Sequence, residues 1–575
     1  TTDSLSVVAA GGAAFNIIRA SVSRRVALLA SALAGFLLVL AGNMRAPVEV
    51  LREGTSAIDQ GWWGTIGWDS SRVVVDTGSQ QEQTINEFPW FSLLLGDLHP
   101  HLTALPFTIL AVVLALNVLR PYRADGTSIR GALPLIATGV MIGALYPLNS
   151  LDFPTYLVVV FGAVLISRGL TTLFLAEAGI IGISAFLAWL PFLVTFVPFA
   201  GTDDSALPDW LRDVPVVSRV FTLLQWHAGE RTSIEEFLTV FGFFWVVIVI
   251  FLVWQAADSV RSHPLDPAMT RWSIAAGLLL AVIAVAAQAP IVLLAGVPLT
   301  ASLWLLTARR RSHSLATVAG NGLIAAGLGL VLVTEFFYVQ DVFSGRYNTL
   351  FKIYYQVWTL LAIACSVGIA LTIRELRKHV ALQGVAVAAL AVGLLAAATY
   401  PVVATLQWTR VQGERSWQGL DGIAFLESQY AGDVAAIKWL AENANEDDVI
   451  IEAPGCSYQI NGGMPTGRMS AFTGVPSLMG WQGHQSQWRA GQPRLLEGIG
   501  QRVSDIAAIY ANPQSDLVDR YGATLLVVGS FERFGAGEAC SSAGPYPAVN
   551  DPSFPGPGWE EVFASGEARI YRRAT

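Results

Sequence analysis

The chain is poor in charged residues and in cysteine. Of its 575 residues, 14% are charged and 53% are hydrophobic, a balance that excludes an ordinary soluble protein of this length. Cys365 lies inside an apolar run, where we expect an inert core residue. Cys456 and Cys540 lie in the polar C-terminal part. Either a disulfide or two free thiols fits the sequence there, and the disulfide requires an extracytoplasmic location.

Several common motifs are missing as well. The sequence contains no Walker A motif, no dinucleotide-binding glycine fingerprint, no HExxH and no CxxC pair. These absences argue against an ATPase and against a haem or zinc protein. The sequence shows no inverted repeat of broken helices, which weakens a transporter interpretation.

The sequence is instead dominated by apolar runs of about 18 to 22 residues, each long enough to cross the hydrocarbon core of a bilayer. We predict a polytopic α-helical membrane protein with about eleven transmembrane helices. The predicted spans are residues 24–43, 102–119, 131–148, 153–168, 171–196, 234–255, 271–287, 290–307, 315–334, 353–373 and 380–400.

Arginine and lysine cluster in alternate loops of this arrangement, as in "RRR" at 309–311 and "RELRK" at 374–378. Basic residues accumulate on the cytoplasmic side of membrane proteins. We therefore predict a multi-pass protein of the plasma (cytoplasmic) membrane with a cytoplasmic N-terminus. The main outward loops are then 44–101, 197–233 and 335–352.

The sequence divides into two predicted domains. Residues 1–400 form a transmembrane helical platform, and residues 401–575 form a soluble extracytoplasmic α/β domain. In the second domain, "GDVAAIKWLAENA" has the apolar spacing of a helix, whereas "DVIIEAP", "TLLVVGS" and "ARIYRR" are typical of short strands.

Ionisable residues interrupt the apolar stretch "FPWFSLLLGDLHPHLTALPF" at 88–107. Asp97, His99 and His101 lie close together there, although ionisable residues beside a bilayer are costly to keep. A carboxylate with two imidazoles is suited to bind a divalent metal such as Mg or Mn, or to act as a general base. The alternative is a helix capped by Asp97 and followed by two interfacial histidines.

Two further outward segments carry acidic or amide residues. Glu87 lies ten residues before Asp97 and approaches it if the intervening half-helix is re-entrant, so both are candidate catalytic carboxylates. The turn "YPLNSLDFPTY" carries Asn149 and Asp152. These two residues are candidate substrate ligands, and the alternative is a capped tight turn.

The loop before the predicted span 353–373 carries Arg346 and Lys352, the latter one of three lysines in the chain. A guanidinium and an ammonium at the level of the lipid headgroups suit a phosphate or diphosphate ligand. The alternative is that both side chains extend to the phosphates of ordinary lipids.

The predicted α/β domain contains a cluster of aromatic and polar residues in "GWQGHQSQWR". Trp481, His484 and Trp488 are suited to sugar binding, because aromatic faces stack on sugar rings and polar groups pair with hydroxyls. Arg489 is a candidate for an anionic ligand. The alternative for the whole cluster is an ordinary domain core.

Four motifs in this order carry a family resemblance: "INEFPWFSLLLGDLHPHLTALPF", "YPLNSLDFPTY", "GRYNTLFKIYYQVW" and "GWQGHQSQWR". They resemble an uncharacterised family of bacterial and archaeal membrane proteins with a YYY signature, a domain of unknown function grouped with the GT-C glycosyltransferase superfamily. Family members usually carry further N-terminal spans and an upstream loop with "DPW" and the tyrosine-rich signature. These upstream motifs do not occur in the sequence, so we expect that part to be carried by a separate partner chain, to be cleaved, or to be lost.

The resemblance implies a GT-C-like fold and a glycosyltransferase of the cell envelope. Such an enzyme transfers a sugar from a polyprenyl-phosphate donor to a glycan or protein acceptor at the extracytoplasmic face. The base or metal ligand would be Asp97, and Arg346 with Lys352 would hold the lipid phosphate. The alternative is a non-catalytic membrane assembly or lipid-binding subunit with a glycosyltransferase-like fold. No nucleic-acid partner is expected.

Overall fold

The structure, a computed structural model, describes residues 2–76, 83–96, 98–119, 131–196, 223–262, 267–308, 314–341, 345–412, 421–456, 466–489, 493–537, 540 and 542–574. These residues form two compact units, one made by the described residues up to 412 and one by those from 421 onward. The helix α19 (Val380–Gln412) belongs to the first unit and runs through residue 400, where we predicted the platform to end.

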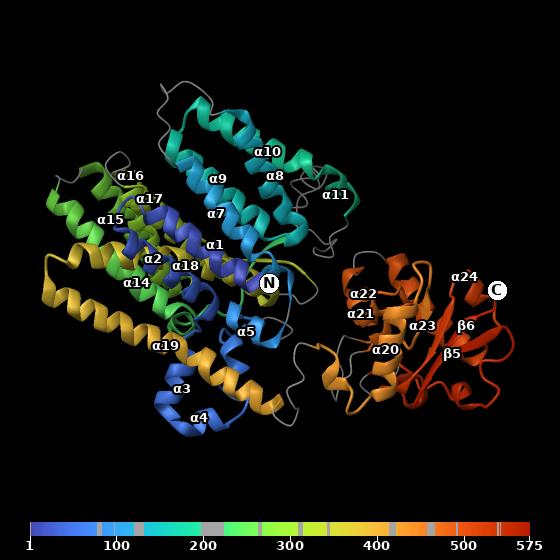
Figure 1. The fold of residues 1–575 in the computed structure, drawn as a ribbon. Helices are drawn as coiled ribbons and strands as arrows, with labels where there is room; N and C mark the ends of the chain where they lie inside the picture. The colour runs from blue at the N-terminus through green and yellow to red at the C-terminus, as the bar shows by residue number, and fades with distance from the viewer. Residues whose placement is uncertain are drawn as a thin grey trace. The chain divides into compact units, whose positions relative to one another are not determined.

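The first unit is a bundle of helices (Figure 1). Its longer helices are α1 (Thr2–Ile18), α2 (Arg24–Gly35), α7 (Leu105–Leu119), α8 (Ala132–Leu148), α9 (Asp152–Arg168), α10 (Thr172–Ala188), α14 (Ile234–Ser262), α15 (Pro267–Ala286), α16 (Ile291–Ala308), α17 (Leu315–Phe336), α18 (Tyr347–Leu376) and α19. Its shorter elements are η1 (Phe36–Leu40), α3 (Arg45–Glu53), α4 (Thr55–Asp59), η2 (Asp69–Ser71), α5 (Pro89–Leu95), α6 (Pro100–Thr103) and α11 (Leu190–Thr195). The strands β1 (Leu224–Trp226) and β2 (Phe337–Val339) pair antiparallel.

Every predicted span coincides with a helix or with two consecutive helices. Among the described residues, α14, α17, α18 and α19 are long and apolar enough to cross a membrane. A fifth span results if α2 with η1 and the following α3, which are bent by 73°, are counted as one. The shorter apolar helices are α1, α7, α8, α10, α15 and α16. The chain is thus built to pass the membrane several times, and the number eleven stays a prediction.

The helix α1 was not among the predicted spans. Its apolar run is short, because polar residues occupy its first turn and Asn16 interrupts it near the end. Its small residues allow α1 to lie close to α2, because a Cβ at Gly11 would stand 2.7 Å from Ser31 Oγ. Ala10, Ala13 and Ala14 are fully buried, which shows that α1 is a packed part of the bundle.

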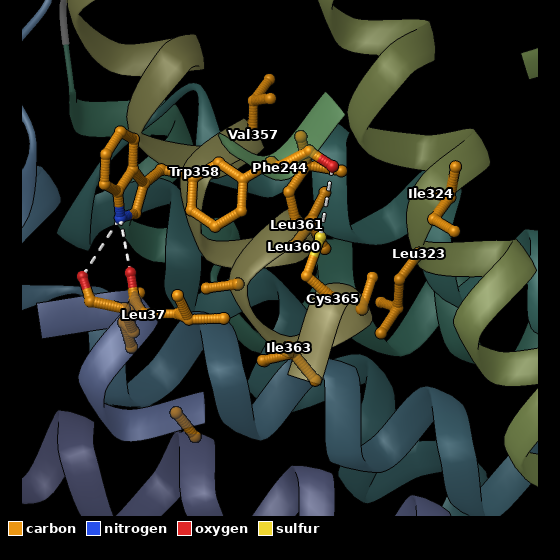
Figure 2. Close-up of a cluster of buried hydrophobic side chains, with 14 of the residues drawn as sticks. Leu37, Phe244, Leu323, Ile324, Val357, Trp358, Leu360, Leu361, Ile363 and Cys365 are labelled. Carbon is orange, nitrogen blue, oxygen red and sulfur yellow. Dashed lines mark hydrogen bonds between the residues drawn. The ribbon is translucent and has the colours of Figure 1, made fainter. Parts of the chain in front are cut away.

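The helix α18 lies at the centre of the first unit. Every residue from Ile353 to Thr372 is buried, as expected for a helix that is apolar on all sides. Trp358 Nε1 donates to the carbonyl oxygens of Leu37 at 3.0 Å and Leu38 at 3.2 Å in the π-helical turn η1 (Figure 2). Cys365 is buried in the same cluster, which confirms the prediction of a core residue.

The last part of α19 is supported by the segment that follows α3. Tyr400 Oη donates to the Gly67 carbonyl at 3.0 Å, and Gln407 Nε2 donates to the Ala57 carbonyl at 3.1 Å. These contacts hold the helix in place beyond residue 400.

The second unit combines helices with a four-stranded sheet of order β3-β4-β6-β5. The strand β3 (Ile450–Ile451) runs parallel to β4 (Leu525–Val528), whereas β6 (Ala568–Arg573) is antiparallel to β4 and to β5 (Trp559–Ser565). The other elements are η3 (Ala424–Leu426), α20 (Ala431–Asn443), α21 (Arg468–Thr473), α22 (Gln482–Trp488), α23 (Pro493–Ala511), α24 (Leu517–Arg520), α25 (Ser530–Phe534) and η5 (Pro547–Asn550). Cys456 and Cys540 form a disulfide with a Cα–Cα distance of 5.5 Å.

A buried ionic cluster joins the end of β3 to the helices α20, α21 and α25. Arg468 is fully buried, and its Nη2 donates to Asp433 Oδ1 at 2.6 Å and to Glu532 Oε2 at 2.8 Å. Glu452 accepts the backbone N–H groups of Met469 and Ser470, each at 3.0 Å, at the start of α21. The four side chains contain three carboxyl groups and one guanidinium, so the cluster favours holding one extra proton.

Candidate functional site

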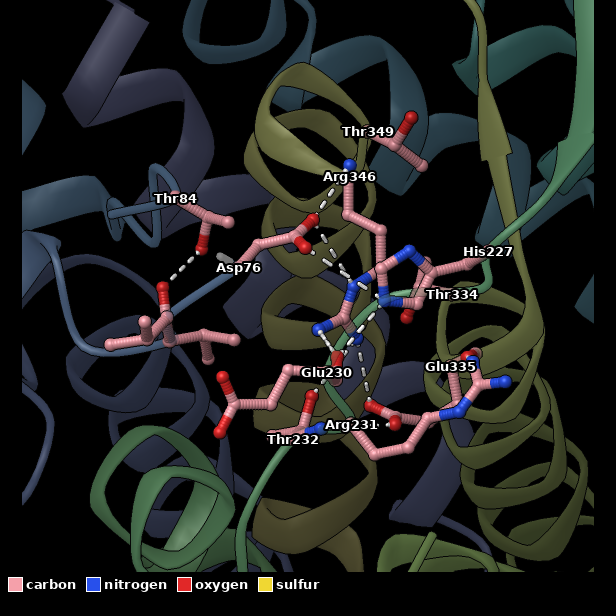
Figure 3. A network of polar contacts seen from close by, with 12 residues as sticks. Asp76, Thr84, His227, Glu230, Arg231, Thr232, Thr334, Glu335, Arg346 and Thr349 are labelled. Atoms are coloured by element: carbon pink, nitrogen blue, oxygen red, sulfur yellow. Dashed lines mark hydrogen bonds and ion pairs between the residues drawn. The ribbon is translucent and has the colours of Figure 1, made fainter. Parts of the chain in front are cut away.

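Segments far apart in the sequence meet around Arg346, the residue before α18 (Figure 3). The side chain is fully buried. Its Nη1 donates to Thr232 Oγ1 at 3.1 Å and to Glu335 Oε1 at 3.3 Å, and its Nη2 donates to the Glu230 carbonyl at 2.9 Å. A buried guanidinium needs such partners because they replace its lost water. Arg346 therefore ties the loop before α14 and the end of α17 to the start of α18.

Asp76 holds the same arginine from a second direction. Its Oδ2 accepts the Arg346 backbone N–H at 3.0 Å and lies 3.6 Å from Arg346 Nε. His227 Nε2 lies 3.9 Å from Asp76 Oδ1 and 2.9 Å from the Glu230 carbonyl (Figure 3). Burial and then the charge of Arg346 lower the pKa of His227. The neutral imidazole donates its Nε2–H to the carbonyl.

Arg346 was predicted to bind a phosphate, and in the structure its side chain is instead surrounded by protein. Its side chain is 0% exposed, and protein oxygens of Thr232, Glu335 and Glu230 accept its N–H groups. Within the structure, Arg346 fixes the first turn of α18, and Lys352 follows it on the same helix.

Lys352 is half-buried and lies among charged residues from several segments. Its ammonium interacts electrostatically with Asp341, Asp152 and His101. The structure thus brings together residues that we selected from three separate motifs. Lys352 is the common member of these interactions.

His101 packs against α18 on both sides of Lys352. Its ring centroid lies 4.3 Å from that of Phe351 and 4.4 Å from that of Tyr355. Burial, then the charges of His99 and Lys352, lower the pKa of His101. The imidazole is 3% exposed, and neither ring nitrogen has a hydrogen-bond partner among the described residues. A neutral imidazole in this state offers one donor and one acceptor.

Asp152, the first residue of α9, connects this region to α18. Its Oδ1 accepts from Gln356 Nε2 at 2.7 Å, and its backbone N–H donates to the Asn149 carbonyl at 2.9 Å. Asp152, Asn149 and Gln356 are all buried. Within the described parts of the chain, Gln356 Oε1 has no hydrogen-bond partner, and Asp152 Oδ2 and Asn149 Nδ2 have none beyond an interaction between these two side chains.

We call this group the Lys352 site; its members are His101, Asn149, Asp152, Lys352 and Gln356. Buried polar atoms without partners are rare in proteins, and several around one ammonium indicate a position for a ligand or for water. Lys352, the Asn149 amide and one His101 nitrogen supply donors, which suit anionic oxygens. Asp152 Oδ2 and Gln356 Oε1 supply acceptors, which suit hydroxyl groups.

Glu87 is joined to this site through other side chains. It lies 3.5 Å from Arg72 Nη1 and accepts from Ser92 Oγ at 3.1 Å. Ser92 Oγ accepts from Tyr355 Oη at 3.2 Å, and the Tyr355 ring contacts His101. Glu87 is 8% exposed and is thus a buried, ion-paired carboxylate that is linked to the Lys352 site through Ser92 and Tyr355.

The predicted metal ligands are only partly described. Asp97 lies outside the described residues, and the rings of His99 and His101 are 5.5 Å apart. Nowhere in the described ranges do three or more His, Cys, Asp or Glu side chains gather as a metal site would require. Lys352 also places a positive charge beside His101, which disfavours a second cation. The described residues by themselves do not fit Mg or Mn. The predicted metal site depends on Asp97, which is not among them.

The structure aligns three of the predicted residues of the second unit in a row. The His484 ring centroid lies 5.7 Å from that of Trp481 and 6.0 Å from that of Trp488. Trp481 Nε1 donates to the Thr466 carbonyl at 2.6 Å, which fixes one end of the row. Trp488 is 53% exposed, and Arg489 follows it with its Nη1 donating to the Gln485 carbonyl at 3.3 Å.

Sequence reasoning did not select Gln356, Tyr355, Asp76 or Thr232. The first two lie in the quoted run "KIYYQVW", where a glutamine one turn after a lysine in an apolar helix was an available signal. The other two lie in loops whose partners are distant in sequence, and no local pattern identified them.

Comparison with known proteins gives two solved structures with a weak likeness. One is the crystal structure of the Archaeoglobus fulgidus oligosaccharyltransferase with Zn and sulfate, with 11% identity, a TM-score of 0.31, and coverage of 92% of this chain and 56% of that chain. The other is the archaeal oligosaccharyltransferase AglB from Archaeoglobus fulgidus with an inhibitory peptide and a dolichol-phosphate, with 12% identity, the same TM-score, and coverage of 92% and 58%.

The chain thus spans a little over half the length of these two enzymes. No curated protein gives a significant match. Residues 2–361 match the family described as "Uncharacterized membrane protein (DUF2298)". The matched range includes every member of the Lys352 site. The chain therefore belongs to the DUF2298 family of membrane proteins.

Proposed function

We propose that the chain is a GT-C-type glycosyltransferase that transfers a sugar from a polyprenyl-phosphate donor to an acceptor at the extracytoplasmic face of the plasma membrane. The observation that carries the proposal is that Lys352 interacts electrostatically with His101 and Asp152, while buried polar atoms of His101 and Gln356 have no hydrogen-bond partner among the described residues. Their mixture of donors and acceptors suits a headgroup that contains both a phosphate and hydroxyl groups.

In this proposal the positive side of the site binds the phosphate. Lys352, the Asn149 amide and the His101 N–H donate to its oxygens, and the charge of Lys352 stabilises the phosphate as it leaves the sugar. Asp152 Oδ2 and Gln356 Oε1 accept from sugar hydroxyls. Arg346 acts as a positioning residue, because it fixes the helix that carries Lys352.

The base of the reaction is assigned to Asp97. Glu87 is already ion-paired to Arg72, whereas Asp97 lies two residues before His99 and four before His101. A carboxylate at this position can take the proton of the attacking acceptor group.

The row formed by Trp481, His484 and Trp488 is proposed to hold the acceptor, a glycan or a glycan-bearing protein, with Arg489 for an anionic group. The exposed Trp488 ring supplies a face for stacking on a sugar. In the same topology the second unit lies outside the cytoplasm, where the disulfide between Cys456 and Cys540 is stable.

The test is sugar transfer in membranes that contain the full chain, with polyprenyl-phosphate hexoses labelled in the sugar. Asp97→Asn is expected to abolish transfer while expression is unchanged. Lys352→Ala is expected to reduce transfer by about 100-fold, the usual loss when one charge-stabilising donor is removed. Lys378→Ala is the matched control, since this lysine is exposed at the other end of α18.

Unchanged transfer by both site variants would refute the proposal. A wild-type chain that binds polyprenyl phosphate at Lys352 but transfers no sugar would instead identify a non-catalytic lipid-binding subunit.

A further inference from the structure

A groove of about 260 Å³ opens between four helices of the first unit. Its walls come from Val112–Leu119 of α7, Val158–Ile166 of α9, Leu299–Leu306 of α16 and Ala319–Ala326 of α17. Every lining residue is apolar. The helix α17 is one of the helices long and apolar enough to cross a membrane. Water is absent at that depth, so hydrocarbon is the only available filling.

Glycines create part of this space. A Cβ built on Gly162 of α9 or on Gly322 of α17 meets no atom within 4 Å. Larger side chains at these positions would therefore project into the groove without colliding with the protein. The groove exists partly because these two residues have no side chain. A larger residue at either position would fill it.

The groove lies at a defined depth along α9. At about 1.5 Å per residue, its lining from Val158 to Ile166 covers about 3 to 15 Å measured from Arg168, the last residue of α9. One leaflet contributes about half of a hydrocarbon core that is roughly 30 Å thick. The groove therefore matches the depth of the leaflet at the Arg168 end.

The Lys352 site lies at the opposite end of the same helix. Asp152 begins α9, and Ile166 lies about 21 Å further along at 1.5 Å per residue. A chain anchored at Asp152 would need to cross the bilayer midplane before it could fill the groove. This depth favours a lipid from the other leaflet over the lipid that binds at the Lys352 site.

We propose that this groove binds an acyl chain of a phospholipid from the leaflet at the Arg168 end of α9. The bound chain fills the space between the α7–α9 pair and the α16–α17 pair, which are packed pairs in the bundle. It acts as a structural lipid, distinct in position from any ligand of the Lys352 site. The inference does not depend on the proposed transferase activity.

The test uses the full chain in vesicles of phosphatidylethanolamine and phosphatidylglycerol that contain a phosphatidylglycerol with a photoreactive acyl chain. After illumination, labelled peptides are mapped. In the wild type, labels are expected on 158–166 and 319–326. Gly322→Leu and, independently, Gly162→Leu are expected to lower this labelling by roughly fivefold or more, because the new side chain occupies the volume of the acyl chain.

Gly329→Leu is the matched control. Gly329 lies two turns further along α17, its Cβ would also meet no atom within 4 Å, and it does not line the groove. Thermal unfolding of each variant shows whether it is folded. Because the two groove variants lie on different helices, the test still applies if one of them does not fold.

Labelling that is unchanged in both folded groove variants, or reduced equally by Gly329→Leu, would overturn the proposal. Excess polyprenyl phosphate is expected to leave the labelling unchanged. If it displaces the label, the occupant is a polyprenyl chain and the proposed phospholipid is wrong.

Discussion

Burial changes the protonation of one carboxyl group of the second unit, that of Glu452. In the second unit, Glu452 is 1% exposed, and burial is the main cause that raises its pKa to about 7. Arg468 and the N–H groups of Met469 and Ser470 partly oppose this effect. The protonated form is therefore favoured in the folded state at mildly acidic pH.

This raised pKa predicts how the stability of the second unit depends on pH. The folded state binds a proton that the unfolded state has lost above its ordinary pKa near 4.5, so the unfolding free energy falls as the pH rises from about 4.5 to about 7. The total change is on the order of 3 kcal/mol. Hydrogen exchange of the β3 and β4 amides in the full chain measures it.

Glu452→Gln keeps an acceptor for the α21 amides and removes the titration of this group, so the unfolding free energy obtained from exchange, after correction for the intrinsic exchange rate, should lose most of its dependence on pH in this range. Glu446→Gln, at an exposed position, should retain the wild-type dependence. If the Glu452→Gln and wild-type profiles coincide, Glu452 is not the titrating group.

At the scale of elements, the start of α18 depends on a buried ion-pair network. Arg346→Met would leave Asp76 and Glu335 buried without their cation, an effect that typically costs about 3 to 5 kcal/mol. Unfolding in mixed micelles is expected to show this loss.

Arg52→Met is the comparison for this prediction. Arg52 pairs with Glu49 at 3.7 Å, but its side chain is 62% exposed, so a change within about 0.5 kcal/mol is expected. Equal, small losses in both variants would show that the network around Arg346 is dispensable.

The positions of the helices could be predicted because long apolar runs are local features of the sequence. The helix α1 was missed because its apolar run is shorter than the length we required for a span. The convergence of His101, Asp152 and Lys352 was suggested by their placement on one side of the membrane. Gln356 and Asp76 could not be assigned, because their roles arise from contacts with segments far away in the sequence.

The charge of a residue in the sequence did not by itself predict the role of that residue in the structure. Arg346 and Lys352 appear equivalent in the sequence, yet Arg346 is 0% exposed and donates to protein oxygens, whereas Lys352 is half-buried and interacts electrostatically with Asp341 and Asp152. A buried arginine can satisfy its N–H groups with protein oxygens, and only the tertiary structure distinguishes such an arginine from a neighbouring lysine.

At the scale of the whole molecule, the proposed topology predicts the accessibility of the second unit. After reduction by an impermeant reagent, a membrane-impermeant maleimide added to intact cells is expected to label Cys456 and Cys540. Cys365 is buried and should stay unlabelled, so Cys365→Ser should give the same result. Labelling that requires opening of the membrane would place the second unit in the cytoplasm.

The central claim is that the Lys352 site binds the phosphate of a lipid-linked sugar. The most direct measurement is a structure of the full chain in a lipid bilayer with polyprenyl phosphate bound. We predict density for the phosphate about 3 Å from Lys352 Nζ, beside His101 and Asn149, as in a charge-assisted hydrogen bond. Phosphate density elsewhere on the chain, with the Lys352 site filled only by water, would contradict it.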